Sequence, residues 1–197
     1  MNTIIKFFVW ITILVFLLLV TLFKITDLKG ALRIIGLVAL IVSLLWLLFD
    51  KWLWKIKYIK AFVKRPNLNG TWTGELVPFR KEGRHIELVI KQSFTKINCV
   101  FRSQTGTNTS FSGEVMYFPD RNIKKLIFNY DYFSIDNPRN PQHSGTCYLD
   151  ISENERTPNT LRGVYWTSKQ RPTRGTINLT FCKKQTFDSY QGNLNCP

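Results

Sequence analysis

The 197-residue sequence lacks the residue patterns on which most catalytic and metal-binding sites are built. It has no Gly-x-Ser-x-Gly nucleophile elbow, no Gly-x-x-x-x-Gly-Lys phosphate loop and no His-Glu-x-x-His zinc motif. Neither histidine, His85 nor His143, has a second metal ligand near it in the sequence. Asp131 and Asp150 are expected on solvated strand faces rather than as a catalytic pair of carboxylates. We therefore expect no catalytic residue, no metal and no cofactor, and a binding protein rather than an enzyme.

Cysteine is scarce, and no two cysteines have the Cys-x-x-Cys spacing. Cys99 and Cys147 lie in apolar, strand-like segments, where a free thiol packs as a small hydrophobic group. Cys182 and Cys196 complete the set of four. This pattern favours reduced structural thiols, with a disulfide as the alternative.

Acidic residues are also few, since 13 Asp and Glu stand against 27 Lys and Arg and give a formal net charge of +14. Such an excess is typical of proteins that bind nucleic acid, anionic lipid or a phosphorylated small ligand. The basic residues of the C-terminal part are scattered and no nucleic-acid motif is present, which argues against extended nucleic acid. The densest basic cluster follows a hydrophobic run, so we expect it to contact anionic lipids.

Two hydrophobic runs near the N-terminus predict two transmembrane helices, at about residues 4–23 and 31–49. A run of roughly 20 apolar residues is enough to cross a hydrocarbon core of about 30 Å. The short connection makes the pair a hairpin, in which Gly36 and Ala39 would let the helices approach closely. A cleaved signal peptide is the alternative for the first run, but no small-residue cleavage site follows it before Lys24.

Positive residues predict how this hairpin is oriented. Six lysines and arginines lie between Lys51 and Arg65, whereas three lie in or beside the hairpin loop. Because positive residues mark the cytoplasmic side, we expect both termini in the cytoplasm. Residues 50–65 are then a basic and aromatic juxtamembrane linker between a membrane part, residues 1–49, and a cytoplasmic part, residues 66–197.

From Gly70 onward the helical period disappears and short alternating segments replace it. Short connections between such segments favour an antiparallel meander, and about eight strands with one dry face close readily into a small β-barrel. A two-sheet sandwich is the alternative. The fold class we expect is a two-helix hairpin plus an all-β ligand-sensing barrel, with Trp72 closing one end. The expected strands are residues 71–77, 85–93, 96–103, 109–118, 125–134, 145–151, 161–166 and 173–181.

The candidate ligand-binding residues combine aromatic rings, hydroxyl groups and arginines. Aromatic rings stack on bases at about 1–3 kcal/mol each, and guanidinium groups donate to phosphate oxygens. The alternative is that these side chains belong to solvated hairpins, with the arginines protecting strand edges. The candidates are Arg102, Ser110, Ser112, Tyr130, Arg162, Tyr165, Trp166 and Arg174.

The order of these features resembles a known family. Two hydrophobic runs, a basic linker, Asn69-Gly-Thr-Trp-Thr-Gly74, Gly163-Val-Tyr-Trp-Thr167 and Gly175-Thr-Ile-Asn-Leu-Thr-Phe181 follow one another along the chain. This arrangement is similar to that of the SMODS-associating two-transmembrane β-strand-rich effectors. They belong to bacterial anti-phage systems that signal with cyclic oligonucleotides (CBASS). The resemblance covers nearly the whole chain and lies more in the architecture than in local motifs.

The resemblance implies a function. In that family a cytoplasmic minimal β-barrel binds a cyclic dinucleotide, which an accompanying nucleotidyltransferase makes on infection. Binding leads to self-association, and the transmembrane helices then disrupt the inner membrane, with growth arrest or cell death. The resemblance thus implies a cyclic dinucleotide ligand, self-association and a bacterial inner-membrane location. One alternative is a membrane-tethered, lipocalin-like binder of an apolar or lipid ligand, for which an all-apolar lumen would be expected. Another is a purely structural anchor whose barrel is filled by its own side chains, for which a solid core with no cavity would be expected.

Overall fold

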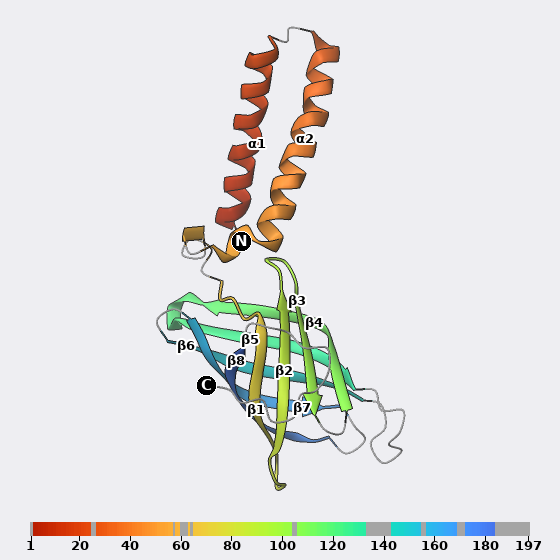
Figure 1. Ribbon diagram of the computed structural model, residues 1–197, viewed down its shortest axis with the longest axis vertical. Helices are drawn as coiled ribbons and strands as arrows, with labels where there is room; N and C mark the ends of the chain where they lie inside the picture. Colours follow the sequence, from red (N-terminus) through yellow and green to blue (C-terminus); the bar gives the residue numbers. More distant parts are fainter. Residues whose placement is uncertain are drawn as a thin grey trace. The chain divides into compact units, whose positions relative to one another are not determined.

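The structure is a computed structural model that describes residues 2–24, 27–56, 58–59, 63, 65–103, 106–132, 143–154, 157–168 and 172–183. The chain divides into two compact units, Met1–Lys64 and Arg65–Pro197. The first is helical and the second is a β-barrel (Figure 1).

Two helices make up most of the first unit: α1 spans Asn2–Phe23 and α2 spans Leu28–Lys51. A short 3-10 helix, η1, follows at Leu53–Lys55. By length and composition, both long helices are apolar enough to cross a membrane, with a mean hydropathy of 2.7 for the first and 2.6 for the second. The predicted hydrophobic runs therefore fold as helices, each slightly longer than expected.

The two helices pack through large rings rather than through small residues. The ring of Phe8 lies edge-on to Trp46, with centroids 4.9 Å apart, and to Phe49, at 5.5 Å. Gly36 faces open space, since a Cβ atom there would meet nothing within 4 Å, and Ala39 is exposed. The expectation that these two small residues bring the helices together is wrong, because the contact face of α2 carries other side chains.

Eight strands form a closed antiparallel barrel in the order of the sequence (Figure 1). Each strand pairs with its sequence neighbour, and β8 pairs with β1 to close the ring. The predicted meander and the barrel are confirmed, and the sandwich alternative is not. A 3-10 turn, η2 (Pro119–Arg121), joins the fourth and fifth strands. The strands are β1 (Gly70–Pro78), β2 (Arg84–Gln92), β3 (Ile97–Ser103), β4 (Gly106–Phe118), β5 (Ile123–Tyr132), β6 (His143–Asn154), β7 (Thr157–Thr167) and β8 (Arg174–Lys183).

Apolar side chains fill the middle of the barrel. The alternation along each strand turns one residue in two inward, as the sequence predicts. Burying a leucine in this way stabilises the fold by about 1.5–3 kcal/mol relative to leaving it exposed. The central layer is solid and apolar, and its fully buried leucines are Leu88, Leu126, Leu149, Leu161 and Leu179.

One end of the barrel is closed by Trp72, as predicted. Its side chain is completely buried, its ring lies edge-on to Phe181 at 5.2 Å, and its Nε1 donates to the carbonyl oxygen of Leu68 at 2.9 Å. Gln92 ties the incoming chain to this end: its Oε1 accepts the Leu68 N–H at 2.8 Å and its Nε2 donates to the Pro66 carbonyl at 3.2 Å. We call the part of the barrel formed by Pro66, Leu68, Trp72 and Gln92 the floor.

The cysteines follow the expectation only in part. Cys99 and Cys147 are free thiols buried in the lumen. Cys182 is disulfide-bonded, so the expectation of reduced thiols is wrong for this residue. Its side chain alternates with the inward-facing Phe181 on β8, so it lies outside the lumen packing that accommodates the two free thiols.

Candidate ligand-binding site

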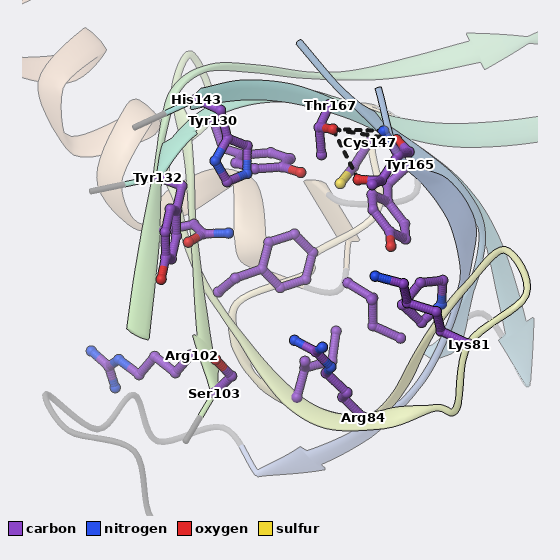
Figure 2. Close-up of a pocket in the computed structure, with 16 residues that line it drawn as sticks. Lys81, Arg84, Arg102, Ser103, Tyr130, Tyr132, His143, Cys147, Tyr165 and Thr167 are labelled. Atoms are coloured by element: carbon purple, nitrogen blue, oxygen red, sulfur yellow. Dashed lines mark hydrogen bonds between the residues drawn. The ribbon is translucent and has the colours of Figure 1, made fainter. Parts of the chain in front are cut away.

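The end of the barrel opposite the floor opens into a cavity of about 180 Å³ (Figure 2). In an antiparallel meander alternate strand ends lie at the same end, and the described strand ends that line this opening include Pro78, Arg84, Ser103, Tyr132, His143 and Thr167. We call it the lumen cavity. Most of the described side chains that line it are polar or aromatic: Lys81, Arg84, Phe101, Arg102, Ser103, Asn108, Tyr130, Tyr132, His143, Tyr165, Thr167 and Thr173.

Basic side chains dominate the polar lining of the lumen cavity. Lys81 reaches it from the β1–β2 connection and Arg84 from the start of β2, and no Asp or Glu is present among the described residues that line it. Arg102 lies at the rim, and its backbone pairs with that of Glu87 in the β2–β3 ladder. Figure 2 shows Lys81 and Arg84 on one side of the cavity with Tyr130 and Tyr132 across from them. This charge distribution suits an anionic ligand.

Two buried tyrosines supply rings and hydroxyl groups to the cavity. Tyr130 is 4% exposed and Tyr165 is 5% exposed. Burial raises the pKa of Tyr130, and the neighbouring Cys147 and Tyr165 raise it further. Burial also raises the pKa of Tyr165, although the positive charge of Arg84 opposes that change. Both hydroxyl groups therefore remain protonated at neutral pH and can donate hydrogen bonds to a ligand.

Two glycines make room for these tyrosines. A Cβ atom on Gly145 would lie 2.5 Å from Cζ and from the hydroxyl oxygen of Tyr130. A Cβ atom on Gly175 would lie 2.7 Å from Cε1 of Tyr165 and closer still to the backbone carbonyl oxygen of Val77. Real Cβ atoms do not approach other atoms so closely, so any larger residue would displace the ring. Each tyrosine ring thus occupies space that is free because the paired residue on the adjacent strand is a glycine.

Threonines fix the rim between β7 and β8. Thr167 Oγ1 accepts the backbone N–H of Thr173 at 3.0 Å, and the two hydroxyl groups lie 2.9 Å apart. The dashed lines of Figure 2 mark these interactions beside Tyr165. This side of the opening is therefore held in place by hydrogen bonds within the protein.

A second hollow, of about 620 Å³, lies on the outside of the barrel at the same end. We call it the outer groove. Phe79 and Trp166 line it and are 56% and 46% exposed. The guanidinium carbon of Arg174 lies 4.9 Å from the centroid of the Phe79 ring, and that of Arg80 lies 5.1 Å from it. Both hollows therefore combine cationic and aromatic side chains.

Five of the eight predicted ligand-binding residues line one of these hollows. Arg102 and Tyr130 line the lumen cavity, Trp166 and Arg174 line the outer groove, and Tyr165 lines both. The sequence predicts these five as parts of a single ligand-binding site. The structure divides them between the inside and the outside of one barrel end.

The other three, Ser110, Ser112 and Arg162, line neither hollow. Ser110 Oγ accepts the Cys99 N–H at 2.7 Å, Ser112 Oγ accepts a hydrogen bond from Asn129 at 2.9 Å, and Arg162 Nε donates to Asn178 Oδ1 at 2.9 Å. A β-bulge lies between Ser110 and Ser112, so the first pairs with inward-facing Tyr130 and the second with outward-facing Asn129. These contacts give the three residues a role within the fold.

Sequence reasoning missed Lys81, Arg84, Tyr132 and His143, all of which line the lumen cavity. The expected strands leave Lys81 and Arg84 in the connection between residues 77 and 85, and His143 draws attention only as a possible metal ligand. Barrel topology supplies the signal that identifies them, because alternate turns of a meander meet at one end. Basic and aromatic residues at or next to the described strand ends on that side then converge on the opening.

Catalytic groups are not brought together in the described part of the chain. Asp131 accepts a hydrogen bond from Ser144 at 2.7 Å, and Asp150 forms an ion pair with Lys125 at 2.6 Å. No group of three or more His, Cys, Asp or Glu suited to a metal ion occurs among the described residues. The arrangement at the open end can bind and orient an anion with planar rings.

Comparisons with known proteins agree with this geometry. The family model described as Cap15, cyclic dinucleotide receptor domain, matches residues 63–181. CD-NTase-associated protein 15 of Staphylococcus schleiferi is 29% identical over 186 residues, which cover 90% of this chain and 95% of that protein. The protein of the same name from Yersinia aleksiciae is 27% identical over 138 residues, or 67% of this chain and 63% of that protein. The resemblance drawn from the sequence is confirmed.

Proposed function

This chain belongs to the Cap15 family of CBASS-associated effectors with a cyclic dinucleotide receptor domain, and we propose that it couples such a ligand to disruption of a membrane. The barrel binds the cyclic dinucleotide at its open end. The helices α1 and α2 cross the bacterial inner membrane, with both termini in the cytoplasm. Ligand binding leads to self-association, and the helices then disrupt the bilayer, with growth arrest or cell death. The partner that supplies the ligand is a nucleotidyltransferase.

One observation carries the proposal: the lumen cavity has cationic and aromatic lining residues and no carboxylate among its described residues. In this proposal Lys81 and Arg84 bind phosphate oxygens, with Arg102 adding positive charge at the rim. Tyr130 and Tyr165 supply ring contacts and hydroxyl donors to the ligand. We assign Ser110, Ser112 and Arg162 to the support of the strands that carry these residues.

A lipid ligand fits this cavity less well. A lipocalin-like binder would need a wide apolar lumen, but the middle of this barrel is filled by its own leucines and by Phe128. The space that remains lies at the polar end and measures about 180 Å³. A phosphorylated ligand at the opening is therefore favoured over an acyl chain in the lumen.

The proposal requires a resting state that the ligand changes. A ligand shifts a two-state equilibrium only by its differential affinity for the two states. Self-association multiplies that effect, because several barrels then act on several helix pairs together. The basic residues between Lys51 and Arg65 contribute to membrane attachment through anionic lipids, at about 1 kcal/mol each near the surface.

Calorimetric titration of the full-length protein in detergent micelles tests the receptor function, with 3′,3′-linked cyclic di-AMP, cyclic di-GMP and cyclic AMP–GMP as probes. We expect at least one to bind, and Arg84→Ala to raise its Kd by about tenfold or more because a charge-assisted phosphate contact is lost. Arg121→Ala removes one charge from η2, at the floor end of the barrel, and serves as the matched control.

The same variants test the effector function in bacteria that also produce a nucleotidyltransferase making the bound ligand. We expect growth arrest with the unmodified chain and with Arg121→Ala, and none with Arg84→Ala. Normal growth of cells that contain both the unmodified chain and its ligand would contradict the membrane-disruption part. A chain that binds no cyclic dinucleotide would contradict the receptor part.

A further inference from the structure

The lumen cavity is too small for a whole cyclic dinucleotide. Pockets that enclose a drug-sized ligand measure about 300–1,000 Å³, and this one measures about 180 Å³. Below it the barrel is filled, with Phe128, Leu126 and Leu149 at no more than 1% exposure. A ligand with two nucleosides can place one half in the lumen at most, so the other half needs a second surface.

The outer groove supplies that surface next to the opening. Pro78, Lys81 and Tyr165 line both hollows, so the two are separated only by these rim residues. The outer groove is the larger of the two, at about 620 Å³. No carboxylate is present among the described residues that line it.

Three neighbouring strand ends place the groove side chains in one row. Trp166 on β7 pairs with Arg174 on β8, and the Phe79 N–H donates to the Arg174 carbonyl at 2.8 Å. Both rings remain partly exposed, and the Phe79 ring lies beside the guanidinium groups of Arg80 and Arg174. Exposed rings with flanking guanidinium groups are the features that hold single bases and phosphates in grooves.

We infer that the lumen cavity and the outer groove form one bipartite site for a cyclic dinucleotide, divided by the rim at Pro78, Lys81 and Tyr165. One nucleotide half enters the lumen beside Tyr130. The other half lies in the groove, with its base against Trp166 and a phosphate near Arg174. Lys81 lies between the two halves. This inference rests on the proposed function, since it takes the ligand class from there.

If the site is bipartite, the lumen cavity and the outer groove should contribute differently to the affinity for a cyclic dinucleotide and for a mononucleotide. A cyclic dinucleotide uses both hollows, and its second half then binds at high effective concentration. A 5′-mononucleotide carrying the same base fills one hollow only, which in this inference is the lumen cavity. A change in the groove should therefore weaken the cyclic ligand much more than the mononucleotide, whereas a change in the lumen should weaken both.

The test is calorimetric titration of the full-length protein in micelles with the best-binding cyclic dinucleotide of the panel and with its 5′-mononucleotide. We expect Trp166→Ala and Arg174→Ala each to raise the Kd of the cyclic ligand by about tenfold. The mononucleotide Kd should change by about twofold or less, and Arg84→Ala should weaken both ligands. Phe111→Ala and Arg121→Ala, which alter exposed residues outside both hollows, are the matched controls.

Each result decides something different. Wild-type affinity for the cyclic ligand in both groove variants, with binding lost in Arg84→Ala, would overturn the bipartite site and leave the receptor function standing. Equal weakening of both ligands in the groove variants would also overturn it. Absence of binding in the wild type would overturn the receptor function itself. Circular dichroism of each variant shows whether the barrel is folded, so that a loss of binding is not a loss of structure.

Discussion

Tyr130 lies in the lumen because the residue beside it on β6 is glycine. Its ring is buried and makes an edge-on contact with Phe101, with centroids 6.0 Å apart. The space for its hydroxyl end is the space that a Cβ atom on Gly145 would fill. A ring held in this way has few alternative rotamers, so it presents the same donor to every ligand that enters.

Gly145→Ala tests this arrangement. The added Cβ atom would lie 2.5 Å from the Tyr130 hydroxyl end and 2.7 Å from the Trp166 carbonyl oxygen, so the ring and strand must shift. We expect a loss of about 1–3 kcal/mol in the free energy of unfolding, as for overpacked cores, together with weaker cyclic dinucleotide binding. Denaturant unfolding and calorimetric titration measure the two effects.

Gly36→Ala is the control, because a Cβ atom at that position meets nothing within 4 Å. It should leave ligand affinity unchanged. In a second comparison, Gly145→Ala should be less damaging in a Tyr130→Ala background, since the ring it displaces is gone. Additive losses in the double variant would show that the glycine does not act through the tyrosine.

Among the elements, the strands could be predicted from the sequence and the β-bulge could not. Alternation such as Ile86, Leu88 and Ile90 gave the strand positions to within a few residues, because period two is a local property. The bulge between Ser110 and Ser112 reverses which side chains face inward, and nothing in the local sequence marks it. The sequence predicts both serines as ligand-binding residues, whereas the structure pairs Ser110 with Tyr130 and Ser112 with Asn129 on opposite faces.

The floor is the part of the barrel unit whose first residues directly follow the helical unit in the sequence. Gln92→Ala removes two side-chain hydrogen bonds, leaving the Leu68 N–H and the Pro66 carbonyl without that partner in a buried region. We expect a loss of about 2–4 kcal/mol in the free energy of unfolding. Gln92→Glu keeps the acceptor for Leu68 but buries a carboxylate against the Pro66 carbonyl, so it should lose at least as much stability.

Ligand binding should respond differently from stability in these floor variants, because Gln92 lies at the end of the barrel opposite the opening. Calorimetric titration at a temperature where both variants are folded should give a near wild-type Kd. Growth arrest in the presence of ligand should be reduced by both Gln92→Ala and Gln92→Glu. Full arrest by both variants would show that the floor hydrogen bonds do not transmit the signal.

At the scale of the whole molecule, the candidate site could be predicted only as a set of residue types. The sequence indicated arginines and aromatic rings late in the chain, and five of eight candidates line a hollow. Lys81 and Arg84 could not be selected, because their role depends on ring closure, which brings β1–β2 and β5–β6 to the same opening. Closure depends on pairing between residues more than 90 positions apart, such as Trp72 and Phe181.

The barrel is also a single hydrogen-bonded ring whose lumen contains several groups that must stay neutral. Burial raises the pKa of Cys99 and of Cys147 above their ordinary value of 9.0, and that of Tyr130 above 10.0. The folded state therefore keeps protons that the unfolded chain loses. Stability from this source is fully present below about pH 9 and falls as pH rises above it.

Unfolding in denaturant between neutral pH and about pH 11, followed by circular dichroism, measures this effect. Each buried group should lower the free energy of unfolding by up to about 1.4 kcal/mol per pH unit above its ordinary pKa. Cys99→Val removes one ionisable group at similar volume and should flatten the decline that begins near pH 9. Val89 on β2 is 1% exposed, and Val89→Ala removes apolar packing instead of an ionisable group, so it should lower stability equally at every pH. An unchanged decline in Cys99→Val would mean that this thiol ionises in the folded barrel as readily as in the unfolded chain.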